Sequence, residues 1–196
     1  MSITDSNLNS GLWPHTPYAE DQPLAHLILT THVLHRGFQV GALGGLLTGS
    51  VRLAINLRRS NPGPAIPSAT KGAARVPPPS PRAGLLIARS TGIGGMIGIG
   101  LLSAILPYKM RGAELIQWQD RSWRLLENKG QVEVDRWSVA GGLMGIGAVV
   151  LAWRRGRALS SGKWNGWTLL GGVGEGSLAG VLGYIGWRYG LMRGER

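Results

Sequence analysis

Cysteine is absent from this chain of 196 residues, and acidic residues and phenylalanine are scarce. Without cysteine, the chain has no disulfide, no cluster held by thiolates and no cysteine nucleophile. Ten acidic residues stand against 21 lysines and arginines, which gives a net charge of +11. Such a basic chain fits either nucleic acid or an anionic membrane surface. Because four apolar blocks interrupt the polar sequence, we expect a lipid bilayer as a partner and no nucleic acid.

Basic residues are also absent from the N-terminal segment. Residues 1–23 hold three acids, no Lys or Arg, and prolines that break regular structure. A secretory signal needs a basic start and an apolar core, and a cleavable mitochondrial presequence is rich in Arg and poor in acids. Residues 1–23 are therefore predicted to form a polar arm, and any targeting information is expected in the internal sequence.

The motifs of common enzyme chemistries are missing from the sequence. There is no phosphate-binding loop, and the glycines at residues 92–95 lie inside an apolar block rather than after a strand. Three histidines, His26, His32 and His35, fall within ten residues, yet no acid or further His follows at the spacing of a metal site. We predict that the chain is not itself an enzyme and has no catalytic, cofactor-binding or metal-binding residue.

Glycine, in contrast, is abundant, with 32 residues. Between Gly37 and Gly49 it recurs at every fourth position, which in water would cost a helix about 1 kcal/mol per glycine relative to Ala. In lipid the backbone must bond to itself, so a helix forms and the glycine row leaves a flat groove for a second helix. A flexible linker would not carry so much leucine and valine. The predicted helix-packing residues are Gly37, Gly41, Gly45, Gly49, Gly92, Gly100, Gly141, Gly145, Gly172, Gly176 and Gly180.

The apolar blocks predict an all-α membrane protein with about four Gly-rich transmembrane helices. The length of the chain suits a single domain. The transmembrane helices are predicted at residues 24–57, 83–107, 137–153 and 168–190. The remaining segments are a Pro-rich basic linker at 58–82, an amphipathic segment at 110–136, a basic loop at 154–167 and a tail at 191–196.

The segment 110–136 has a pattern of its own. On a helical wheel its tryptophans and leucines share one half, while acids, amides and arginines fill the other. This pattern predicts a short amphipathic helix that lies at the membrane interface or docks on a partner, and the mixed charge of its polar face favours docking on protein. The predicted docking residues are Trp118, Asp120, Arg121, Trp123, Arg124 and Trp137.

Glu175 is the one acid inside the predicted spans. An unpaired carboxylate in hydrocarbon is costly, so Glu175 is expected to pair, to be protonated or to face a polar interior. Arg36 and Arg89 are the expected intramembrane partners, and a structural ion pair or a contact to a partner subunit is the preferred interpretation. Proton transfer is the alternative, although transport generally uses a chain of polar residues across the bilayer.

The polar middle of the chain resembles a known family. Residues 117–121 (Gln-Trp-Gln-Asp-Arg), residues 124–126 (Arg-Leu-Leu) with Asn128, and residues 135–137 (Asp-Arg-Trp) resemble the NUXM-type accessory membrane subunit of fungal mitochondrial complex I. The flanking Gly-rich spans extend the resemblance over residues 25–190. The resemblance implies a non-catalytic subunit in the membrane arm of this NADH:ubiquinone oxidoreductase, a respiratory-chain complex of electron transport. Such a subunit would support assembly or stability by Gly-mediated helix packing.

The same resemblance implies a multi-pass protein of the mitochondrial inner membrane. Its partners would be other membrane-arm subunits of complex I and the surrounding bilayer. In place of a cofactor we expect a bound phospholipid, such as cardiolipin.

Two other classes stay open. The Tim family of inner-membrane protein translocases also has four Gly-rich spans, but its members carry an Arg-x-x-x-Asp motif between the second and third spans. Here Ser-Trp-Arg-Leu follows Arg121, and Leu-Leu-Glu-Asn follows Arg124, so this motif is missing. The third class is a small ion or solute transporter that uses Glu175 with Arg36 or Arg89.

Overall fold

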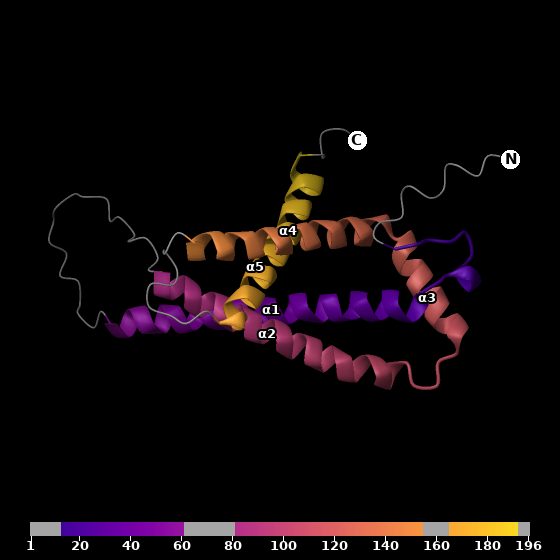
Figure 1. Cartoon of the computed structure of the whole chain (residues 1–196), viewed down its shortest axis with the longest axis horizontal. Coiled ribbons are helices and arrows are strands. Elements are labelled where there is room, and N and C mark those ends of the chain that lie inside the picture. The colour runs from indigo at the N-terminus through magenta and orange to yellow at the C-terminus, as the bar shows by residue number, and fades with distance from the viewer. Residues whose placement is uncertain (1–12, 61–80, 155–164, 192–196) are drawn as a thin grey trace.

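The computed structural model of the protein describes residues 13–60, 81–154 and 165–191 (Figure 1). In these ranges the fold is all-helical, as predicted, and no strand is present. The helices are α1 (Ala25–Ser60), α2 (Pro81–Lys109), α3 (Leu115–Glu127), α4 (Lys129–Arg154) and α5 (Gly166–Gly186), with short helices η1 (Ala19–Asp21) and η2 (Trp187–Leu191). Most of the predicted segments 58–82 and 154–167, and all but the first residue of 191–196, lie outside the described residues.

Three helices in the described part of the chain are long and apolar enough to cross a membrane, namely α1, α2 and α4. They contain the predicted spans 24–57, 83–107 and 137–153, apart from Leu24, which precedes α1. Helix α5 has 21 residues but does not meet the same hydropathy criterion. Glycine contributes little apolar surface, and Glu175 in the middle of α5 is strongly polar, so both lower its hydropathy.

Helix α4 begins at Lys129, so the predicted start of the third span at Trp137 is wrong as a helix boundary. Asn128 explains the difference, because it ends α3 and also caps α4. Its side-chain Oδ1 accepts a hydrogen bond from the backbone N–H of Gln131 at 3.2 Å, as an N-terminal cap does. Residues 129–136, expected in the amphipathic segment, therefore form the first two turns of α4.

The helices fall into lengthwise, crossing and end positions. In Figure 1, α1, α2 and α4 run along the length of the molecule, α5 crosses them steeply, and α3 lies across one end. Helix α1 packs on α2, α4 packs on α5, and α5 also contacts α1 and α2. Helix α3 contacts α1, α4 and η1. The amphipathic helix α3 therefore covers one end of the molecule, where it packs on α1 and α4.

A row of glycines on α1 forms a seam with α2. A Cβ atom added at Gly41 would overlap the carbonyl oxygen of Gly94, and one added at Gly45 would overlap that of Ser90. A Cβ added at Gly98 of α2 would likewise overlap the carbonyl oxygen of Gly37. Gly49 lies against Ser90 as well. The two backbones are therefore in direct contact, which only residues without a Cβ allow.

A second seam joins α4 to α5. Gly141 lies against Gly176, and Gly145 lies against Gly172, so a Cβ at Gly141 or Gly145 would overlap the carbonyl oxygen of its partner. At the far end of this seam, Gly180 lies against the backbone of Trp137. All five glycines were predicted to pack helices, and the structure shows which rows meet.

Helix α2 has a second glycine contact, on α5. A Cβ at Gly92 would overlap the carbonyl oxygen of Trp167, and one at Gly171 would overlap that of Ala88. Gly100 was predicted to pack as Gly92 does, but a Cβ there would meet nothing within 4 Å. Gly100 is exposed on α2, so it faces neither of the two helices that the other glycines of α2 contact.

Small residues make up much of the interior of this bundle, together with a few large ones such as Ile28, Phe38 and Tyr184, whereas most large apolar residues lie on its surface. Ala42 and Thr91 are fully buried between the helices. The most exposed large apolar residues of the long helices include Val40, Leu47, Ile97, Leu101, Leu143 and Met144. An exposed apolar surface of this extent is the expected outer face of helices in lipid or against a partner.

Candidate functional site

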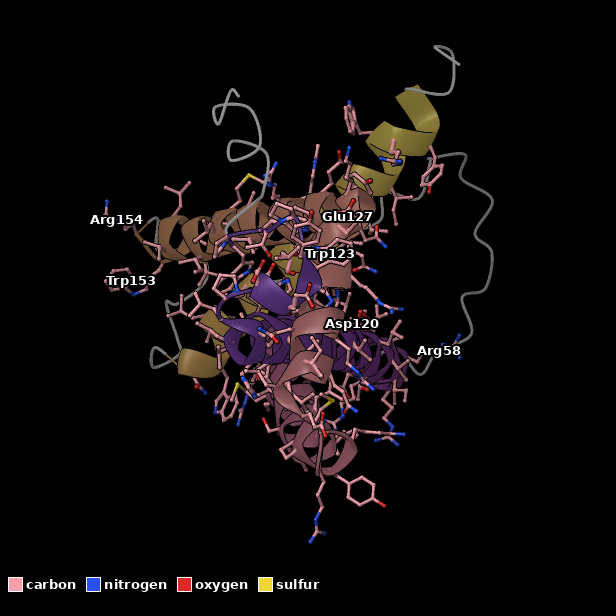
Figure 2. All side chains as sticks on the ribbon, turned by 90° about the vertical axis from the view of Figure 1, so that its right-hand side faces the viewer. Arg58, Asp120, Trp123, Glu127, Trp153 and Arg154 are labelled. Carbon is pink, nitrogen blue, oxygen red and sulfur yellow. The ribbon has the colours of Figure 1, made fainter. Side chains whose placement is uncertain are left out.

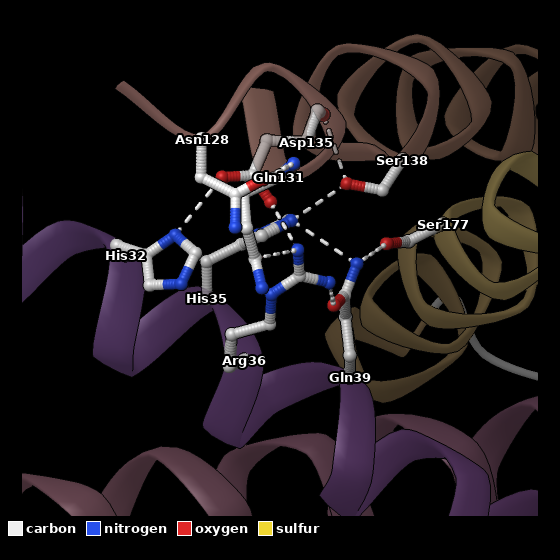
Figure 3. A network of polar contacts seen from close by, with 9 residues as sticks. All are labelled: His32, His35, Arg36, Gln39, Asn128, Gln131, Asp135, Ser138 and Ser177. Carbon is white, nitrogen blue, oxygen red and sulfur yellow. Dashed lines mark hydrogen bonds and ion pairs between the residues drawn. The ribbon is translucent and has the colours of Figure 1, made fainter. Parts of the chain in front are cut away.

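The main cluster of polar side chains joins α1, α4 and α5, and we call it the polar junction (Figure 3). Its α1 members recur every three or four residues and so share one face of that helix. They point toward the first turns of α4 and the middle of α5 (Figure 3). The polar junction comprises His32, His35, Arg36 and Gln39 of α1, Gln131, Asp135 and Ser138 of α4, Asn128 before α4, and Ser177 of α5.

Asp135 is the charged centre of the polar junction. Its Oδ1 lies 2.7 Å from a terminal nitrogen of Arg36, and its Oδ2 lies 2.9 Å from Nδ1 of His32. The guanidinium of Arg36 also donates to the side-chain oxygens of Gln39 at 2.8 Å and Gln131 at 3.1 Å. One carboxylate of α4 therefore holds two residues that are one helical turn apart on α1.

Gln39 connects this charged centre to α5. Its amide nitrogen donates to the hydroxyl of Ser177 at 3.0 Å and lies 3.2 Å from Nε2 of His35. The same His35 nitrogen lies 2.8 Å from the hydroxyl of Ser138. Gln39, Ser138 and Ser177 are all buried, so these bonds are shielded from solvent. The polar junction thus fixes the rotation of three helices relative to one another.

The hydroxyl groups of the polar junction form hydrogen bonds within and between helices. Ser138 donates to the backbone carbonyl of Asp135 at 2.9 Å, and Ser177 accepts from an amide. Among the residues described, no group of three or more His, Asp or Glu side chains is placed to hold a metal ion.

A cavity of about 140 Å³ adjoins the polar junction between α1, α3 and α4. His32, His35 and Asp135 line one side of it, and Trp13 of the N-terminal arm lines another. The remaining walls come mainly from apolar residues, among them Ile28, Leu125, Leu126, Val132 and Val139. The arm thus forms part of the bundle at this end of the molecule.

The predicted ion pair of Glu175 with Arg36 or Arg89 is wrong in this structure. Arg36 pairs with Asp135 instead, which the earlier start of α4 brings into the helical part of the chain. Arg89 is exposed on α2. Glu175 accepts one long hydrogen bond, from the hydroxyl of Thr91 at 3.4 Å, and forms no ion pair within the described residues.

Of the predicted docking residues of α3, the two tryptophans contact other parts of the chain, and the charged residues lie on its exposed side. The ring centroids of Trp118 and of His26 on α1 lie 4.4 Å apart. The indole N–H of Trp123 donates to the backbone carbonyl of Thr16 at 2.9 Å. Asp120 and Arg124 pair with each other at 2.9 Å on the exposed side, and Arg121 is exposed. Figure 2, which looks onto this end, shows Asp120, Trp123 and Glu127 one after another along α3.

The N-terminal arm is the partner that the sequence pattern did not identify. Gln22, just before α1, is 2% exposed, and its amide donates to the carbonyl of Pro14 at 2.8 Å. Gln119 of α3 donates to the carbonyl of Glu20 at 2.6 Å. The amphipathic helix therefore docks on residues 13–22 of its own chain. A buried glutamine in a polar, Pro-rich segment leaves no periodic signal in the sequence.

Trp137, predicted to dock on a partner, belongs to an aromatic cluster where α4 meets the end of α5. Its ring lies 6.4 Å from that of Tyr184 and 6.0 Å from that of Trp187. Beside it, Glu133 accepts hydrogen bonds from the hydroxyl of Tyr184 at 2.9 Å and from Arg188 at 3.1 Å. These contacts continue the α4–α5 seam beyond its last glycine.

Comparison with known proteins adds no relative to this description. No model of a known protein family matches the chain, and no curated protein sequence matches it.

Proposed function

We propose that the protein is a non-catalytic accessory subunit of the membrane arm of mitochondrial complex I. In this role it is a multi-pass protein of the inner membrane that supports assembly or stability of the oxidoreductase. The observation that carries the proposal is the pair of glycine seams, together with the apolar residues exposed around them. Helices in backbone contact form a rigid, compact unit, and its apolar outer surface is suited to neighbouring helices and lipid.

The proposal includes α5 as a fourth transmembrane helix. At 1.5 Å per residue its 21 residues span about 30 Å, the thickness of a hydrocarbon core. It contacts α2 through Gly171 and α4 through Gly172 and Gly176. Its buried residues are mostly glycine, which allows the three neighbouring helices to approach its backbone closely.

Helix α3 and the start of α4 carry the residues that resemble the complex I subunit. The inner side of α3 is covered by the N-terminal arm and α1, whereas Leu115 is 59% exposed and Ile116 is 45% exposed. Arg121 is exposed on the same helix. Apolar residues and a cation at the end of a helix bundle suit the headgroup layer or a neighbouring subunit.

A bound phospholipid fits the groove between α1 and α2. This groove has a volume of about 470 Å³, and its floor is the glycine seam at Gly41, Gly45 and Gly94. Its walls are apolar over most of its length, and Arg52 lies at its rim. An acyl chain would contact the walls while the guanidinium faced the phosphate. The helix-bundle role therefore includes holding lipid between subunits.

A native gel of mitochondrial membranes in mild detergent tests the main proposal. The chain, tagged at its C-terminus, is blotted beside an in-gel stain for NADH dehydrogenase activity. We expect the tag to migrate with the stained band. Migration at another size, without the stain, would contradict the assignment to complex I and favour a translocase or a free carrier.

One observation favours a second candidate function, a small transporter. Glu175 has no cationic partner in the described residues. An acid that exchanges an ion or a proton must be free of such a partner. Under this alternative, Glu175→Gln would abolish transport by the purified protein in vesicles and leave its migration on the native gel unchanged. An accessory subunit would show no transport to lose.

A further inference from the structure

A groove on the surface of the bundle has Glu175 as its polar residue. The groove lies between α1, α2 and α5 and has a volume of about 320 Å³. Its other lining residues are Leu46, Gly84, Ile87, Leu178, Ala179 and Leu182. The carboxylate therefore lies in this apolar groove, near the middle of α5.

The carboxylate of Glu175 lacks the partner that its position requires. Its one hydrogen bond, from Thr91, is 3.4 Å long, and Thr91 also donates to the backbone carbonyl of Ile87 at 3.0 Å. Arg36 is engaged by Asp135 at 2.7 Å. A half-buried acid in apolar surroundings is strongly disfavoured unless a cation or further donors complete it. The described part of the chain supplies neither.

The shape of the groove admits another helix. Gly84 on one wall has nothing within 4 Å of the position of a Cβ, and Ala179 on the other wall is small and exposed. Glu175, Ala179 and Leu182 are spaced by four and three residues, so they share one face of α5. Leu182 is 68% exposed at the rim, where it is free to contact an incoming apolar surface.

We propose that this groove is the docking surface for a transmembrane helix of another membrane protein, which places a Lys or Arg side chain against Glu175. The proposal rests on the proposed function only in requiring that α5 crosses the bilayer. Charge complementarity selects the occupant, because the groove offers an uncompensated negative charge between apolar walls. An anionic lipid headgroup would be repelled by the same carboxylate.

Site-specific photocrosslinking in the protein's own membranes tests this inference. A photoreactive phenylalanine analogue replaces Ala179 at the edge of the groove, and in a control chain it replaces Leu143, which is 65% exposed on α4. Crosslinked products are digested and the joined peptides are identified by mass spectrometry. The control position reports whether each variant is inserted and folded.

We expect the Ala179 position to crosslink to an apolar segment of a second protein that contains Lys or Arg. Glu175→Gln should reduce this product about tenfold, the effect of losing a polar contact of roughly 1–2 kcal/mol between membrane helices. Glu175→Lys should abolish it, and replacing the partner's mapped Lys or Arg by Glu should restore it. Glu133→Gln, which removes a carboxylate at the far end of the α4–α5 seam, should leave it unchanged.

Three outcomes would overturn the proposal: products with lipid alone, products with a second copy of this chain, or a protein product that persists in Glu175→Lys. Loss of the crosslinks at both positions in Glu175→Gln would indicate that this variant misfolds. The test then depends on whether Glu175→Lys, combined with Glu at the partner's mapped Lys or Arg, restores the Ala179 crosslink. The native gel separates this test from the proposed function. A charge-dependent crosslink in a chain that does not migrate with complex I would support the groove as a docking surface and reject the complex I assignment. Migration with complex I without a charge-dependent crosslink would support the assignment and reject the docking surface.

Discussion

Helix α1 contacts α2 through glycines and α4 through long polar side chains, and the two contacts hold their partners in different ways. On the first side, Gly41 and Gly45 lie against backbone carbonyls of α2. On the second side, Arg36 and His32 reach the carboxylate of Asp135 on α4. The first contact depends on shape at the distance of van der Waals contact, and the second depends on charge and hydrogen-bond direction.

The α1–α2 seam and the polar junction should therefore tolerate different kinds of substitution. The seam has no side chain that can rotate away, so added volume must move an entire helix. The polar junction has flexible side chains and several alternative donors around one carboxylate, so it can rearrange after a small change. The seam should therefore be sensitive to volume and insensitive to charge, whereas the polar junction should show the reverse.

The largest effect is expected for Gly41→Leu. The new side chain would overlap the backbone of Gly94, so α1 and α2 must separate, at a cost of about 3 kcal/mol. We expect a large fall in the protein that accumulates in membranes and in its aggregation temperature in mild detergent. Gly44→Leu is the matched control, because a Cβ at Gly44 meets nothing within 4 Å on the same helix. Equal damage from both variants would show that the seam is not the cause.

A smaller effect is expected for Asp135→Asn at the polar junction. The change leaves Arg36 without its charge partner and weakens the contact with His32, and the pair is 28% exposed on both sides. We expect a loss of about 1–2 kcal/mol, less than for a fully buried pair, measured as aggregation temperature. Asp120→Asn removes a surface pair with Arg124 and should change stability by no more than about 0.5 kcal/mol. Comparable losses would mean that the polar junction contributes no more than a surface pair.

A local effect is expected for Trp123→Phe at the end of the molecule. The variant replaces the indole by a smaller aromatic ring and removes the N–H that bonds the carbonyl of Thr16, a loss of about 1 kcal/mol from the hydrogen bond. Because this bond holds the N-terminal arm on α3, limited proteolysis should cut residues 13–23 faster. Trp137→Phe alters the aromatic cluster beside α5 and should leave that cleavage rate unchanged. An arm that stays protected in Trp123→Phe would contradict the assigned role of this bond.

The smallest effect is expected for Gly100→Ala, and it should have the opposite sign. The added methyl group meets nothing within 4 Å, and Ala is the better helix former by at most about 1 kcal/mol. The aggregation temperature should stay the same or rise slightly. Gly92→Ala on the same helix should lower it, because its Cβ would overlap the carbonyl of Trp167. If Gly100→Ala proved as harmful as Gly92→Ala, an undetected neighbour of Gly100 would be required.

The glycine rows could be predicted from the sequence because a four-residue spacing places residues on one side of a helix. Which rows meet could not be predicted. Helix α2 has one row, with Gly94 and Gly98, that faces α1, and another glycine, Gly92, that faces α5. The choice depends on the crossing angle of α5, which is a property of the whole bundle. The spacing alone made Gly100 look equivalent to Gly92.

The polar junction was only partly visible in the sequence. The cluster of His32, His35 and Arg36 was evident, but its partner on α4 was not, because Asp135 was expected just before a helix rather than inside one. Asn128 decided that boundary by capping a helix that starts at Lys129. The end of the amphipathic helix at Asn128-Lys129-Gly130 can be predicted from the sequence. A capping residue that also ends the preceding helix leaves almost no loop, so the start of the next helix at Lys129 cannot.

Each of the two main glycine seams joins helices that are neighbours in the chain, α1 with α2 and α4 with α5. With α5 as the proposed fourth span, a newly made chain could enter a membrane as two helical hairpins, each able to complete its closest backbone contact without the other. The contact of Gly92 with α5 and the polar junction then join the hairpins in a second step. Biogenesis of this protein would proceed from local pairing to long-range docking, with the second step the more exposed to failure.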